Sequence, residues 1–274
     1  MGTSMSNKGQ NGKNPLVPPW AEESPPVKIS NPADSGDSEV CNDDVQDANK
    51  GNVNTEPSPN RFTGARRAFG DYAKSGSRDD LKRSLGHYSR SASGGGNGVA
   101  RRLASGITAG AGLMGLLSGN QVQTSQGQIS LSSLAGLTTD QAIDKVVEVL
   151  TPNNADADVV RSAINYALSE ALEDFAEFSD VTFTSEILGQ VLTCYLTDLI
   201  FEQVVLDMGE AWLHAETPLR QINMEGDLRE LIKAIVNSKL AENDHAALTN
   251  FNAKTSVELQ SSIIKETISE WESF

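Results

Sequence analysis

The sequence predicts an all-α helical domain preceded by a long disordered N-terminal arm. Residues 1–60 are rich in Pro, Asn, Ser, Gly and Asp, and their few apolar residues show no period. From residue 138 onward, apolar residues recur at the three- and four-residue spacing of amphipathic helices. Strand-like alternation is nearly absent. We therefore expect three parts: the arm (1–60), a basic belt with a Gly hinge and a small-residue helix (61–118), and an acidic α-helical bundle (138–274).

The arm is predicted to stay disordered because it has too little apolar surface to bury. Ordering its backbone costs roughly 1–2 kcal/mol per residue, which a segment of this composition does not offset. From Asp34 to Asp47 it is acidic, and self-repulsion would extend it as a spacer, unless it lies against the basic belt.

Charge is distributed unevenly along the chain. The whole protein carries a net charge of −15, yet residues 61–102 hold ten Lys and Arg residues against three Asp residues. This belt calls for an acidic partner, inside or outside the chain. The overall acidity argues against general nucleic-acid affinity of the whole chain, although not of the belt.

Two short helices are expected within the belt. Residues Gly64 to Ser75 place an apolar stripe on one face, and a second helix begins after Ser77, which is expected to form a capping box with Asp80. The belt is either a solvated basic face or a surface for an anion or an acidic partner. A lone histidine here is expected to pack or to cap a helix rather than to act as a catalytic base. The residues that would bind a partner are Arg66, Arg67, Lys82, Arg83, His87 and Tyr88.

Small residues dominate the next stretch. Ser91 to Gly98 is predicted to be a flexible hinge, and Val99 to Leu117 a helix in which Gly106 and Gly110 let another helix approach closely. No charged residue lies between Arg102 and Asp140, but the stretch from Leu103 to Leu117 has only 15 residues, four of them Gly, whereas a membrane span needs roughly 17–25 apolar residues. We expect a buried helix, with a membrane-active segment as the alternative. Asn120 to Gln128 is expected to be a loop.

Five further helices are predicted after residue 137. Four carry a recognisable start: Thr138 with Gln141 as a capping box, Asp156 or Asp158, Ser185, and Asp227. The fifth is expected to run from Ser256 to Trp271. Val181 to Thr184 is the only candidate strand.

No arrangement of residues in the sequence supports an enzyme. There is no Walker A loop. The three histidines and two cysteines are widely separated and do not show the spacing of metal ligands. Four carboxylates on one predicted helix, at Glu170, Glu173, Asp174 and Glu177, have no Glu-x-x-His companion and are expected to be a solvated face. Cys194 lies in an apolar run, which favours packing. We expect no cofactor, no metal and no disulfide, and a reducing cytoplasmic setting, because the polar N-terminus shows no signal peptide.

The arm itself carries two features of interest. Removal of the initiator Met would expose the amine of Gly2, which with Ser6 also satisfies the short myristoylation pattern; a plain flexible terminus is the alternative. Residues 15–20, Pro-Leu-Val-Pro-Pro-Trp, favour an extended polyproline conformation that loses little entropy on docking. Trp20 is either a binding anchor or packs on the chain's own domain.

Several motifs together resemble the QatB family of bacterial Qat anti-phage defence systems. They are Met-Gly-Thr-Ser at the start, Pro-Leu-Val-Pro-Pro-Trp, Arg61-Phe62-x-Gly64, Leu85-Gly86-His87-Tyr88, Arg101-Arg102 after a Gly-rich run, and Leu206-Asp207-Met208-Gly209. The resemblance implies three companions: a P-loop ATPase, an enzyme similar to 7-cyano-7-deazaguanine synthase (QueC-like), and a TatD-like nuclease. It implies no catalytic activity for this component.

The resemblance gives the arm a more specific expected role. A QueC-like enzyme activates a carboxylate on a deazaguanine with ATP, and Gly2 would be the amine acceptor. Thr3 and Ser4 would then lie in the channel of that enzyme, while Pro18, Pro19 and Trp20 would dock outside it. The rival functions are a nucleic-acid-binding adaptor that uses Arg66, Arg67, Lys82 and Arg83, and a membrane-active effector that uses residues 103–117.

Overall fold

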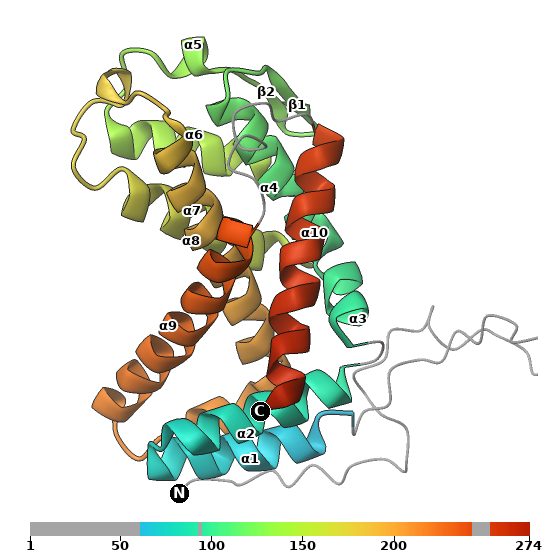
Figure 1. Ribbon diagram of the computed structural model, residues 1–274. Coiled ribbons are helices and arrows are strands. Elements are labelled where there is room, and N and C mark those ends of the chain that lie inside the picture. Colours follow the sequence, from blue (N-terminus) through green and yellow to red (C-terminus); the bar gives the residue numbers. More distant parts are fainter. Residues whose placement is uncertain (1–60, 93–94, 243–252) are drawn as a thin grey trace, which may run out of the picture. The chain divides into compact units, whose positions relative to one another are not determined.

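A computed structural model describes residues 61–92, 95–242 and 253–274, and these form a helical domain (Figure 1). The all-α prediction is therefore confirmed for this part of the chain, whereas the predictions for residues 1–60 lie outside it. The helices are α1 (Thr63–Ser75), α2 (Arg78–Ser91), α3 (Gly95–Arg102), α4 (Ala104–Leu117), α5 (Leu131–Leu134), α6 (Thr139–Leu150), α7 (Ala157–Ala171), α8 (Ser185–Met208), α9 (Pro218–Glu242) and α10 (Ala253–Glu270). Two strands, β1 (Val122–Thr124) and β2 (Gly127–Ile129), and the 3₁₀ segments η2 (Phe178–Asp180), η3 (Gly209–His214) and η5 (Trp271–Ser273) complete it.

Helix α8 is the centre of the hydrophobic core. Every residue from Val191 to Phe201 is buried, including polar ones, and the helix packs against α4, α7 and α9. A helix that is covered on all sides needs apolar residues around its whole circumference, which is why α8 has no strong polar face. Residues of the expected belt, of α4 and of the later helices share this one core.

The predicted helix from Val99 to Leu117 is interrupted at Leu103, which separates α3 from α4. The flexible hinge expected over Ser91 to Gly98 is wrong for Gly95–Gly98, because these residues form the first turn of α3. A Cβ atom on Gly96 would lie 2.8 Å from the Cα atom of Lys265 in α10. Close packing of α3 on α10 therefore explains this glycine better than flexibility does.

The close approach predicted at Gly106 and Gly110 is confirmed. A Cβ atom at Gly106 would lie 2.5 Å from Cδ1 of Leu199, and one at Gly110 would lie 2.5 Å from Cε1 of Tyr195. The Tyr195 hydroxyl donates a hydrogen bond of 2.7 Å to the carbonyl oxygen of Gly106. Helix α4 is thus a buried helix held against α8, as predicted. Within the described residues, no helix has both the length and the apolar character needed to traverse a bilayer.

The loop expected over Asn120 to Gln128 is instead an antiparallel hairpin. Val122 pairs with Ile129, and the Thr124 hydroxyl donates a 2.7 Å hydrogen bond to the carbonyl oxygen of Val149 in α6. Tertiary contacts therefore stabilise strands whose polar sequence does not predict them. The strand considered at Val181 to Thr184 does not form.

Most helix starts agree with the sequence within one or two residues. The capping box of Thr138 and Gln141 is present at α6, and α7 follows Asp156. Ser77 caps α2, but it accepts from the backbone N–H of Asp79, while the Asp80 carboxylate accepts from Ser75, so no capping box with Asp80 forms.

Three helix starts differ from the prediction. Helix α10 already includes Ala253, three residues before the predicted start at Ser256. Thr184 rather than Ser185 caps α8. Helix α9 begins at Pro218 and not at Asp227, which lies in its middle. Proline is favourable in the first turn of a helix because its missing N–H has no intrahelical partner there.

We predict that Gly110→Ala lowers the free energy of unfolding by about 1–3 kcal/mol, because the added methyl group overpacks the contact with Tyr195 and Gln260. Urea denaturation followed by circular dichroism measures the change. Gly115→Ala on the same helix is the matched control, since no atom lies within 3.8 Å of the new methyl group. The control should be neutral or stabilising by up to about 1 kcal/mol. Equal effects of the two changes would contradict the close-packing explanation.

Candidate interaction site around Asp207

Helices α1 and α2, which the sequence predicts, pack against each other and form a platform. Their buried face consists mainly of Ala, Leu and aromatic side chains, and most of their basic side chains point outward. The aromatic rings are in direct contact: Phe62 stacks on Tyr88 with centroids 5.2 Å apart, and Phe69 lies 5.2 Å from Trp212 of η3. The platform is thereby packed on the segment that follows α8.

Asp207, at the end of α8, joins this platform to the bundle. Arg102 Nη1 donates hydrogen bonds of 3.0 and 2.8 Å to the two carboxylate oxygens, and the Tyr88 hydroxyl donates one of 2.8 Å to Oδ2. Arg66 Nε donates a 2.9 Å hydrogen bond to the backbone oxygen of Asp207. One residue therefore receives bonds from α1, α2 and α3.

The environment of Tyr88 keeps its hydroxyl a donor. Burial raises the pKa of Tyr88 far above its ordinary value, and the negative charge of Asp207 raises it further, while Arg102 opposes this. Arg102 also lies over the Phe62 ring, 5.6 Å from its centroid. This arrangement binds the helices together and contains no activated nucleophile or base.

Three of the cations predicted to bind a partner make contacts within their own chain. Arg66 is bound to Asp207, and Arg83 pairs with Asp80 at 2.9 Å and with Asp71 at 3.5 Å. Lys82 lies 5.4 Å from the centroid of the Phe274 ring. Each of these three cations thus already has a contact within its own chain.

Of the other predicted residues, Tyr88 is only 1% exposed and contributes to the core in this structure, so a partner would not reach it directly. Arg67 and His87 are exposed. The arm residues Gly2, Thr3, Ser4, Pro18, Pro19 and Trp20 lie outside the described residues.

Sequence reasoning missed the second anchor of the platform, Arg220. It donates hydrogen bonds of 2.8 and 3.1 Å to the carbonyl oxygens of Tyr72 and Ala73, at the C-terminal end of α1. A cation at this position is favourable because the last carbonyl groups of a helix lack intrahelical partners. The Tyr72 hydroxyl in turn donates to Asp227 at 3.0 Å. Asp207 had a sequence signal, its place in the Leu-Asp-Met-Gly motif, whereas Arg220 had none.

A second buried charge cluster links α8 to α9. The fully buried Asp198 pairs with Arg229, whose guanidinium lies 3.8 Å from the centroid of the Phe201 ring. Burial lowers the pKa of Arg229, and the Ser162 hydroxyl lies within hydrogen-bonding distance of Asp198 and of Glu202. Removing either partner of such a pair would be strongly destabilising, because it would leave a buried charge uncompensated.

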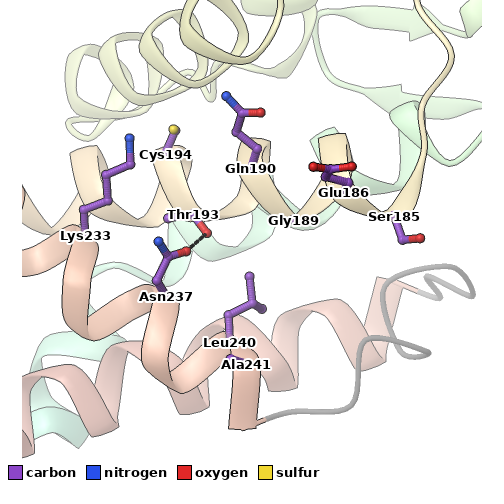
Figure 2. A pocket seen from close by; sticks show the side chains of 10 residues that line it. All are labelled: Ser185, Glu186, Gly189, Gln190, Thr193, Cys194, Lys233, Asn237, Leu240 and Ala241. Atoms are coloured by element: carbon purple, nitrogen blue, oxygen red, sulfur yellow. Dashed lines mark hydrogen bonds between the residues drawn. The ribbon is translucent and has the colours of Figure 1, made fainter.

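A groove of about 680 Å³ lies between α8 and α9 (Figure 2). Cys194 and Lys233 lie beside each other at one end of it, and Thr193 donates a 3.0 Å hydrogen bond to Asn237. Burial raises the pKa of the Cys194 thiol, the opposite of the shift that a nucleophilic cysteine needs. The prediction that Cys194 serves packing agrees with this environment.

The prediction that four carboxylates share one helix is wrong, because α7 ends at Ala171: Glu170 lies in α7, whereas Glu173, Asp174 and Glu177 follow it. Among the described residues, no three His, Cys, Asp or Glu side chains are grouped so as to hold a metal ion. Glu170 instead lies 3.8 Å from the amine of Lys233.

The fold and the site define a helical domain with one shared hydrophobic core, in which ion pairs such as Arg102–Asp207 also join the basic part to the acidic part. A comparison with protein families identifies the family: residues 94–270 match the model of QatB, the Qat anti-phage system associated protein. The chain therefore belongs to the QatB family and has a role in an anti-phage defence system, with partners in that system. No curated protein and no solved structure shows significant similarity to it.

The matched range contains only some of the motifs on which the resemblance in the sequence was based. Arg101-Arg102 and Leu206–Gly209 lie inside it, so the Arg102–Asp207 pair joins two of the stretches on which the resemblance was based. The arm and the motifs at residues 61–64 and 85–88 lie before its first residue.

We predict that Asp207→Asn destabilises the protein by about 1.5–3 kcal/mol, because it weakens hydrogen bonds that a charged group makes to Arg102 and Tyr88. Thermal and urea unfolding measure the change. Asp158→Asn, which affects only the exposed pair with Arg161, should cost no more than about 0.5 kcal/mol. If the two variants were equally stable, Asp207 would not be the joint described here.

We also predict a steep loss of stability above pH 10. Burial raises the pKa values of Tyr72, Tyr88 and Tyr195 above 10, so the folded protein retains three protons that the unfolded chain releases. Folding is then opposed by about 1.4 kcal/mol per pH unit for each tyrosine as the pH rises beyond 10, and the contribution is absent at lower pH.

Urea unfolding between pH 9 and 11.5 measures this slope. Tyr195→Phe should reduce it by about 1.4 kcal/mol per pH unit. An unchanged slope in this variant would mean that the Tyr195 hydroxyl ionises in the folded protein.

Proposed function

We propose that this QatB-family protein is a non-enzymatic scaffold whose N-terminal glycine is modified by a QueC-like companion. Family membership over residues 94–270 is the observation that carries the proposal, since it places the chain in a multi-component defence system. The residues Gly2, Thr3 and Ser4 supply an unhindered amine followed by small side chains. The setting would be the cytoplasm.

The proposed modification is an amide bond. The QueC-like enzyme activates the carboxylate of a deazaguanine with ATP, and the Gly2 nitrogen attacks the activated carboxyl carbon. The ATP-derived leaving group departs with the bonding electrons, and the nitrogen loses one proton. No oxidant or reductant is required, and the protein gains the mass of the acid less one water.

The scaffold part of the proposal concerns the helical domain. Its platform of α1 and α2 is anchored at two positions, by Asp207 and by Arg220, so it is a firm base on which companion proteins can dock. The expected companions are the QueC-like enzyme and the P-loop ATPase, with the TatD-like nuclease as a third. Pro18, Pro19 and Trp20 would provide a separate contact in the arm.

The contacts of the belt favour protein docking over nucleic-acid binding. Phosphate recognition needs several cations that are free to replace counterions. Of the four cations expected to do this, Arg83 is paired with carboxylates and Arg66 is bonded to a backbone oxygen, and the net charge of −15 opposes nucleic-acid binding by the chain as a whole. The membrane reading of residues 103–117 is likewise not favoured, because α4 is buried against α8.

The test is the intact mass of the full protein co-expressed with its QueC-like companion. We expect a mass increase that maps to the N-terminal peptide and disappears in Gly2→Pro, because proline offers only a hindered secondary amine. Gly9→Pro is the matched control and should keep the adduct. An unmodified N-terminal peptide in the wild-type protein would overturn the proposed modification.

A further inference from the structure

Four large hydrophobic side chains are well exposed in the part of the chain that the structure describes, and all lie between residues 206 and 222. Leu206, Leu213, Leu219 and Ile222 are 63–68% exposed. Single exposed leucines are ordinary on protein surfaces, whereas several within one short segment indicate an interaction site. We refer to these four side chains as the apolar strip.

The segment that carries the apolar strip runs alongside α1. Asp207 contacts Arg66, His214 faces Gly70 at the distance of a close packing contact, and Arg220 bonds the carbonyl oxygen of Tyr72. These contacts follow the same order in both segments, so the two are parallel neighbours. Leu206, Leu213 and Leu219 each follow or precede a residue with a direct contact to α1, namely Asp207, Trp212 and Arg220. Ile222 follows Leu219 by three positions, which places both on one face of α9.

The α1 edge of this surface is basic. Arg67 and Lys74 are exposed, and neither forms an ion pair within residues 61–92, 95–242 and 253–274. The one acidic residue of α1, Asp71, pairs with Arg83. The segment of the strip adds Glu210 and Glu216, both exposed, so the positive charge is concentrated along α1.

We propose that the apolar strip and the α1 edge together form a docking surface for an amphipathic helix of a companion protein. That helix would place aliphatic side chains on the strip and Asp or Glu side chains toward Arg67 and Lys74. Helix α1 has 13 residues and is about 20 Å long, which matches three to four turns of a bound helix. The inference rests on the proposed scaffold function, and it names the surface and the chemistry of the partner.

Two other occupants fit the surface less well. An anionic membrane would be repelled by a chain whose net charge is −15, and the strip has no aromatic side chain to anchor it in the headgroup region. A second copy of the chain would bring the basic α1 edges near each other in many arrangements. A partner helix that carries both aliphatic and acidic side chains would cover the apolar strip and pair with the cations Arg67 and Lys74.

The test uses the full-length protein and the purified QueC-like and ATPase companions of the same system, with affinity measured by calorimetry at two salt concentrations. We expect Leu213→Ser combined with Leu219→Ser to weaken binding of one companion at least tenfold. Leu213→Met combined with Leu219→Met should retain the affinity, because methionine preserves the apolar contact. Arg67→Glu combined with Lys74→Glu should weaken binding and reduce its salt dependence. Lys145→Glu on α6 is the control and should leave both the affinity and its salt dependence unchanged.

Each outcome has a defined consequence. If the wild-type protein binds neither companion, the scaffold function and the docking surface both fail. If it binds a companion and the serine variant binds equally well, only the docking surface is wrong. The serine variant must also unfold at the wild-type temperature, as expected for exposed positions. Self-association of the wild type that the serine changes abolish, or flotation with anionic vesicles that depends on them, would overturn the proposal in favour of a second copy or a membrane.

Discussion

The carboxylate of Asp207 is the joint on which the described structure depends. It receives two hydrogen bonds from Arg102 and one from Tyr88, while its backbone oxygen receives one from Arg66. A partly buried carboxylate without such partners would be costly, and so would an unpaired Arg102. The interaction therefore stabilises the attachment of α1, α2 and α3 to the end of α8 as a unit.

This joint explains much of the uneven charge of the chain. The basic belt was expected to need an acidic partner inside or outside the molecule. Three of its arginines are paired with carboxylates of the same chain. Arg102 pairs with Asp207, Arg78 with Glu230, and the belt also provides its own pairs through Arg83. Several belt cations remain exposed without a carboxylate partner among the described residues, and two of them, Arg67 and Lys74, lie on α1, the helix that borders the apolar strip.

Glycine shows why sequence patterns alone misjudge some elements. The run at Gly95–Gly98 was predicted to be a hinge, because glycine permits unusual backbone conformations, yet it forms a helical turn. Glycine is needed at Gly96 because it has no Cβ atom, and this allows α3 to pack closely on α10. The same property was predicted correctly at Gly106 and Gly110, where the spacing of four residues indicated a contact face. Without knowledge of the neighbouring helix, the two uses of glycine cannot be separated.

The sequence by itself determined the helical class, the two belt helices, the buried character of α4 and several helix starts, because these follow from local periodicity and capping. It also indicated the QatB family through short motifs. The tertiary structure alone decided that Tyr88 is buried, that Arg220 anchors α1, that residues 122–129 form a hairpin, and that four large hydrophobic side chains between residues 206 and 222 are exposed. These features depend on contacts between residues up to about 150 positions apart, and no local pattern encodes which distant side chain a charge or a ring will meet.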